Sequence, residues 1–83
     1  MITEIDEPVT VGAVFSGGGV AVKWFVWRGR TVTVNRETFR WKTTRGRREV
    51  HCFALAGGND VFEISFTAAD LSWNLEKIHL PES

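Results

Sequence analysis

Arginine, lysine and tryptophan residues are concentrated in the middle of the chain, and these residue types can bind nucleic acid together. Guanidinium groups pair with phosphates, and indole rings stack on unpaired bases. The sequence therefore predicts a nucleic-acid-binding surface formed by nine residues: Trp27, Arg28, Arg30, Arg40, Trp41, Lys42, Arg45, Arg47 and Arg48. Single-stranded DNA or RNA is the ligand that this combination of residues favours.

Charge is segregated along the chain although the net charge is zero. Residues 1–22 carry three acids and no base, residues 23–48 carry nine bases and one acid, and residues 49–83 carry six acids and one base. Such asymmetry is typical of a surface that faces an anion. Two alternatives stay open. In the first, the bases are solvated or pair with Glu49, Glu63 and Glu76. In the second, the protein binds another protein: either the basic surface docks an acidic partner or an open edge strand pairs with a peptide.

Nucleophilic catalysis and metal binding find little support in the sequence. His51 and Cys52 are adjacent, so in a strand their side chains point to opposite faces and cannot form a nucleophile–base pair. One cysteine and two distant histidines lack the spacing of metal ligands. Residues 17–19 are three glycines without the spacing of a phosphate-binding loop. We therefore expect no enzymatic activity, no cofactor and no metal ion.

Length and composition indicate one small domain. A chain of 83 residues with 43% apolar residues can fold independently around a single core. One cysteine excludes an intrachain disulfide, and the acidic N-terminal residues do not resemble a signal peptide. No segment approaches the roughly 18 apolar residues of a membrane span. These features favour a cytoplasmic protein that does not contact a membrane.

Alternation of apolar and polar residues predicts an all-β fold. Residues 1–83 are expected to form a single β domain, in which residues 1–8 are a disordered or loosely attached tail. Residues 67–72 are the one short helical candidate. The six predicted strands span residues 9–15, 20–27, 31–41, 47–56, 61–67 and 73–80.

Tight turns join these strands and leave no room for crossover helices, so the sequence predicts an antiparallel meander. Gly29 is expected to adopt a positive φ in a hairpin turn. The apolar phase shifts near residues 35–38 and again between Leu75 and Ile78, which predicts a bulge or break at the first place and a bulge at the second. Because bulges bend strands, we expect the sheet to curl into a small barrel that covers its edges.

Residues 24–34, with the sequence WFVWRGRTVTV, resemble the signature F-x-W-R-G-R-x-Y-x-V of a family of small uncharacterised bacterial β proteins. Trp41, residues 61–66 and residues 73–75 match later positions of the family, so the resemblance covers roughly residues 22–79. Val32 stands where the family often has tyrosine. Some members are associated with translesion-type DNA polymerases, which implies an association with DNA repair. The family offers no catalytic residues to carry over, so the resemblance bears mainly on the fold.

The sequence thus predicts a non-enzymatic binding module that contacts nucleic acid through its arginine-rich hairpin face. The alternative is a protein-interaction module in which that face docks an acidic partner or peptide, the bases being otherwise paired within the fold. The positions of the arginine side chains distinguish the two. One contiguous exposed patch favours a ligand, whereas dispersal among carboxylates favours a self-paired face.

Overall fold

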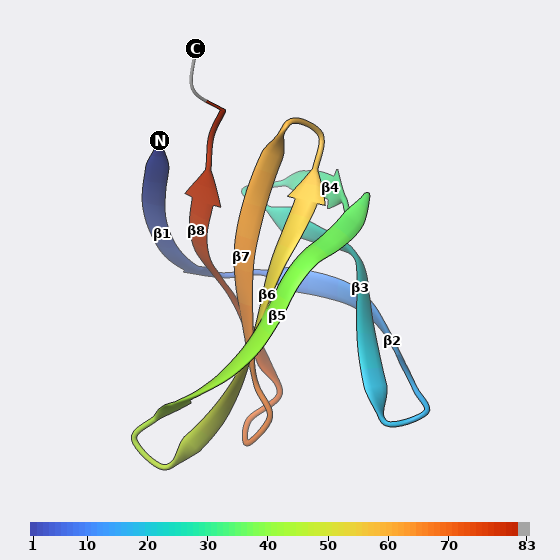
Figure 1. Cartoon of the computed structure of the whole chain (residues 1–83), viewed down its shortest axis with the longest axis vertical. Coiled ribbons are helices and arrows are strands. Elements are labelled where there is room, and N and C mark those ends of the chain that lie inside the picture. The colour runs from blue at the N-terminus through green and yellow to red at the C-terminus, as the bar shows by residue number, and fades with distance from the viewer. Residues whose placement is uncertain (82–83) are drawn as a thin grey trace.

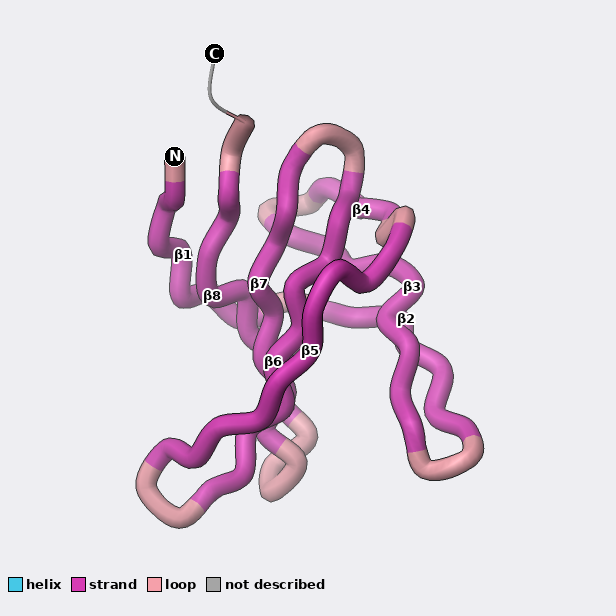
Figure 2. Tube along the Cα trace, viewed as in Figure 1, coloured by secondary structure: helices cyan, strands magenta, loops and turns pink. Residues whose placement is uncertain are grey.

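The computed structural model describes residues 1–81, which form eight strands and no helix (Figure 1; Figure 2). Five strands form sheet A, in the order β1-β8-β7-β6-β5, and three form sheet B, in the order β2-β3-β4; all neighbours are antiparallel. The all-β prediction is confirmed, and no helix within residues 1–81 could cross a membrane. The bounds are β1 Ile2–Pro8, β2 Thr10–Ser16, β3 Gly19–Trp27, β4 Arg30–Thr33, β5 Arg36–Arg45, β6 Arg48–Gly57, β7 Asp60–Thr67 and β8 Ser72–His79.

The first additional strand is β1, where a loose tail was predicted. Its main chain pairs with β8 from Ile2↔His79 to Pro8↔Asn74, with one bulge between Glu4 and Glu7. Alternate side chains of β1 are half-buried, and Ile5 packs against the core. The prediction of a loose tail was wrong because main-chain pairing with β8 holds this strand in place. The acidic composition of the segment does not reveal that pairing.

The second additional strand arises because the predicted strand 31–41 divides in two. β4 belongs to sheet B and β5 to sheet A, so the chain crosses between the sheets at Val34 and Asn35. Val34 N donates to Lys23 O at 3.0 Å, and Asn35 N donates to Ala56 O at 2.7 Å. A bulge follows between Glu37 and Phe39. The predicted irregularity is therefore both a break and a bulge.

The core lies between the inner faces of the two sheets. The Phe25 ring of sheet B meets the Phe62 ring of sheet A edge to face, with centroids 5.1 Å apart. In β8, Glu76 is the extra residue of a bulge, which lets Leu75 and Ile78 both face inward, as predicted. The buried core residues are Val22, Phe25, Phe53, Leu55, Phe62, Ile64, Phe66, Leu75 and Ile78.

Two further predictions were wrong. Residues 68–71 form a turn between β7 and β8 rather than a helical turn, with Leu71 at a φ of 56°. The sheets do not close into a barrel: β4 pairs only with Trp24–Trp27 of β3, so among the described residues the rest of β3 has a strand partner, β2, on one side only. In Figure 1 the β2–β3 hairpin diverges from the β5–β6 hairpin. The four-residue β4 is too short to carry sheet B around to β5.

The β3–β4 turn confirms the prediction for Gly29, which has a φ of 75° next to Arg28 at 50°. Two positive φ angles are typical of a type I′ turn. We expect Gly29→Val to lower the free energy of unfolding by about 1–2 kcal/mol through backbone strain, because side chains disfavour this conformation. Apart from its two chain neighbours, no atom of residues 1–81 lies within 4 Å of the position a Cβ would take, so a clash would not contribute.

Urea unfolding of Gly29→Val and of the control Gly19→Ala measures this effect. Gly19 lacks a positive φ, and an added Cβ would make only an ordinary contact of 3.6 Å with Ser16 O. An equal loss of stability in both variants would contradict the assignment of strain to Gly29.

Candidate binding surfaces

At the end of β3, the predicted site residues Trp27 and Arg28 are bound to Glu7 of β1. Arg28 donates from Nε and Nη2 to the two carboxylate oxygens of Glu7 at 3.3 and 2.6 Å. The indole Nε1 of Trp27 donates to Oε1 of the same carboxylate at 3.0 Å. These hydrogen bonds hold the pKa of Glu7 below its ordinary value, and the bond from Arg28 has a larger effect than the bond from Trp27. The Glu7 carboxylate thus already binds the Arg28 guanidinium and the Trp27 indole N–H, the groups that a nucleic acid would have to contact here.

Arg40 links the two sheets. It lies on the inner face of β5 opposite Phe53, and its guanidinium is 4.8 Å from the centroid of the Phe53 ring. Its Nη2 donates to Val20 O of β3 at 2.5 Å and to Glu37 Oε1 at 2.7 Å. Arg40 therefore links β3 to β5, two strands that do not pair with each other in the described part of the chain.

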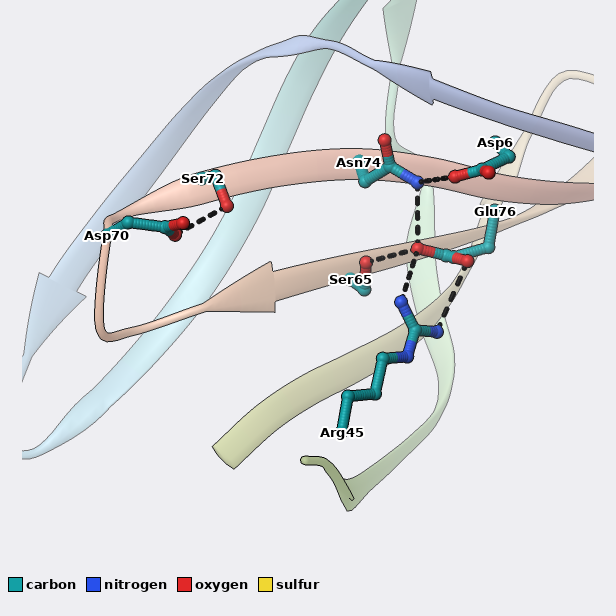
Figure 3. A network of polar contacts seen from close by, with 7 residues as sticks. All are labelled: Asp6, Arg45, Ser65, Asp70, Ser72, Asn74 and Glu76. Carbon is teal, nitrogen blue, oxygen red and sulfur yellow. Dashed lines mark hydrogen bonds and ion pairs between the residues drawn. The ribbon is translucent and has the colours of Figure 1, made fainter. Parts of the chain in front are cut away.

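Arg45 reaches across the outer face of sheet A to Glu76 (Figure 3). The two nitrogens Nη1 and Nη2 donate to the two carboxylate oxygens, each at 3.2 Å. Glu76 also accepts hydrogen bonds from Ser65 Oγ at 2.6 Å and Asn74 Nδ2 at 2.8 Å, and the same amide donates to Asp6. Burial raises the pKa of Glu76, but the hydrogen bonds from Arg45, Ser65 and Asn74 outweigh it, so the pKa lies below its ordinary value.

The predicted basic residues do not form one contiguous patch. The β5–β6 turn lies at the lower end of the view in Figure 1, whereas β4 lies in the upper half. Arg30 and Arg47 have no ion pair among residues 1–81. Glu49 and Glu76 act as predicted partners, whereas Glu63 contacts His79 instead. The other five predicted basic residues each form an ion pair with a carboxylate, namely Arg28–Glu7, Arg40–Glu37, Lys42–Glu49, Arg45–Glu76 and Arg48–Asp70.

Two aromatic residues on the outer face of β5 form a surface that the site prediction covered only in part. Phe39 stacks on Trp41 with ring centroids 5.5 Å apart and an interplanar angle of 28°. Phe39 is 64% exposed, whereas Trp41 is half-buried. The sequence contained a sign of this pair, because Phe39 and Trp41 are two residues apart on a strand and so lie on the same face. This pair offers a ring face on which a planar group can stack.

A cleft of about 820 Å³ opens between the β2–β3 hairpin and β5. Phe15, Val20 and Phe66 give it an apolar lining, and Arg40 and Lys42 are the basic residues among those that surround it. Phe15 is 62% exposed, and its ring centroid lies 6.1 Å from that of Phe66. Sequence reasoning missed this cleft because it depends on the divergence of the two sheets.

His51 and Cys52 lie on opposite faces of β6, as predicted. His51 borders the cleft, with its ring centroid 6.5 Å from that of Phe66. Cys52 is 6% exposed, and burial raises the pKa of its thiol. A thiol with a raised pKa is a weak nucleophile at neutral pH. Within residues 1–81 no cluster of three or more histidine, cysteine or acidic side chains is arranged to hold a metal ion.

Comparison of the chain with protein-family models, curated proteins and solved structures finds no match. The resemblance to proteins with a W-R-G-R signature therefore stays a prediction.

Proposed function

We propose that this protein is a non-enzymatic module that docks an extended segment of a partner protein against β5. The observation that carries the proposal is an apolar cleft beside a long edge strand. β5 has ten residues, of which nine are exposed, and β6 is its only strand partner among the described residues. An open strand edge can accept an added strand through main-chain hydrogen bonds, while neighbouring pockets select its side chains.

The exposed aromatic ring of Phe15 supports the same proposal. Removal of the Phe15 surface from water lowers the free energy of the complex, so a ligand that covers this ring binds more tightly. The cleft volume lies within the range that ligand sites usually have, roughly 300–1,000 Å³. The single cysteine is consistent with a reducing, cytoplasmic setting for this interaction.

Binding of single-stranded nucleic acid is the second candidate, and the Phe39–Trp41 stack favours it. Base stacking on such rings tolerates any sequence, and Arg36 lies on the same strand without an ion pair among residues 1–81. The association with DNA repair that the family resemblance implies belongs to this candidate. Pairing of five predicted bases with carboxylates weakens it, because the paired acids lower the potential that attracts phosphate.

A phage-displayed library of random 12-residue peptides and a 12-nucleotide oligothymidylate distinguish the two candidates. We expect the protein to enrich peptides whose binding slows hydrogen exchange of β5 amides, and Phe39→Ala to leave that binding unchanged. Failure to enrich any peptide contradicts peptide docking. Oligothymidylate binding at about 50 mM salt that weakens steeply with added salt and is lost in Phe39→Ala would put the nucleic-acid candidate first.

A further inference from the structure

Residues 19–20 of β3 and residues 40–42 of β5 line the cleft. Residues 19–22 of β3 pair with β2 on one side, and no described strand pairs with them on the other. β5 is the end of sheet A. The Arg40 side chain spans the opening between them and donates to Val20 O. The acceptor on β3 that an added strand would use is therefore bound by a side chain and not by another strand.

The opening continues on the other side of Arg40. A second cavity of about 380 Å³ is lined by Val14, Ala21 and Lys23, and it shares Val20 and Arg40 with the larger cleft. Arg40 thus stands between two cavities that lie along the same stretch of β3. An inserted strand would replace the guanidinium at Val20 O with a main-chain amide.

The side chains around this opening define what such a strand must carry. Phe15 and Phe66 would contact a large apolar side chain that points into the cleft. Arg40 and Lys42 line the cleft, and Lys23 lines the second cavity, so cations lie on both sides of the opening. The carboxylates that now pair with Arg40 and Lys42 are exposed, and exposed ion pairs contribute little to stability. A carboxylate of the ligand can therefore replace them.

We infer that an extended peptide segment with alternating apolar and acidic side chains inserts between β3 and β5 and pairs with both edges. This inference rests on the proposed docking function and specifies its ligand and its binding mode. The inserted strand completes the connection between sheets A and B that the chain itself leaves open on this side. It places an apolar side chain against Phe15 and Phe66 and a carboxylate beside Lys42.

Peptides enriched from the random 12-residue library test the inference. We expect them to alternate apolar with acidic residues and to slow hydrogen exchange at residues 19–22 as well as in β5. Phe15→Ser should weaken their binding by on the order of tenfold or more, and Lys42→Ala by several-fold. Ile2→Ser and Arg30→Ala are the matched controls, because Ile2 is also exposed but lies in β1 at the opposite edge of sheet A, and Arg30 lies in β4. Neither control should change the affinity.

The outcomes separate this inference from the docking function. If the enriched peptides slow hydrogen exchange in β5 but not at residues 19–22, or if they lack acidic residues, the proposed docking function stands and the inference of insertion between β3 and β5 is overturned. Failure to enrich any peptide overturns both. A concentration-dependent dimer that protects the same amides would assign the opening to a second copy of the chain, and oligothymidylate that protects them would assign it to nucleic acid. Either result overturns the inference.

Discussion

Replacement of Phe25 by alanine is expected to lower the free energy of unfolding by about 3–5 kcal/mol. Phe25 is completely buried, and it packs edge to face on Phe62 of the opposite sheet. Among the described residues, sheet B contributes only Phe25 and Val22 to the fully buried core, and truncation of Phe25 removes the larger of these two side chains. The total stability of a small domain is about 5–15 kcal/mol, so much of it would be lost. Urea unfolding followed by tryptophan fluorescence measures the change.

Phe15→Ala is the matched control for Phe25→Ala. Both residues lie on the inner face of sheet B, but Phe15 is mostly exposed at the mouth of the cleft. We expect Phe15→Ala to change the free energy of unfolding by no more than about 0.5 kcal/mol, as is usual for surface substitutions. Equal losses in the two variants would show that Phe15 is a core residue and that the cleft does not exist in solution.

The strands with strong apolar alternation could be predicted because burial imposes it directly. Phe62, Ile64 and Phe66 lie two residues apart and all face the core, as predicted. The phase shift in β8 was also visible in the sequence, since a bulge must bring Leu75 and Ile78 to the same face. Local patterns therefore predicted the positions of these strands and the irregularities near residues 35–38 and between Leu75 and Ile78.

The division into two sheets could not be predicted in this way. Alternation shows which side chains face inward, but it does not show which strand lies beside which. The crossing at Val34 and Asn35 depends on hydrogen bonds to Lys23 and Ala56, which lie far away in the sequence. The pattern of apolar residues is therefore the same for a single antiparallel meander and for two open sheets, and it could not distinguish them.

The candidate site depended even more on distant contacts. Arg45 pairs with Glu76, 31 residues further on, and Arg28 pairs with Glu7, 21 residues earlier. The sequence located the basic stretch and named Glu76 as one possible partner, but it did not assign Glu76 to Arg45 or point to Glu7. These pairs form only once β1 and β8 are in place. The cleft depends on the shortness of β4, which no pattern of apolar residues encodes.

The acid sensitivity of folding is expected to depend on Glu76. Its side chain is 19% exposed and receives hydrogen bonds from Arg45, Ser65 and Asn74. We expect Glu76→Ala to lower the free energy of unfolding at pH 7 by about 1–3 kcal/mol, chiefly because the buried Ser65 hydroxyl loses its acceptor; the exposed guanidinium of Arg45 can bind water instead.

The same network makes the effect of Glu76→Ala dependent on pH. The folded-state pKa of Glu76 lies below its ordinary value of 4.5, so the unfolded chain binds a proton more readily than the folded one. Its stabilising contribution is therefore complete above the ordinary pKa and is lost as the pH falls through the folded-state pKa. The pKa values of Glu7 and Asp70 are lowered as well, so the variant keeps part of the wild-type acid sensitivity.

Urea unfolding at pH 7, 5, 4 and 3 tests this prediction, with Glu4→Ala as the control because Glu4 is an exposed residue of β1. The stability difference between the wild type and Glu76→Ala should be largest at pH 7 and should shrink as the pH falls below about 4.5. The difference for Glu4→Ala should stay small throughout. Parallel curves for the wild type and Glu76→Ala would mean that the Glu76 carboxylate is equally easy to protonate in the folded and unfolded chains. The bonds from Arg45, Ser65 and Asn74 would then not favour its charged form.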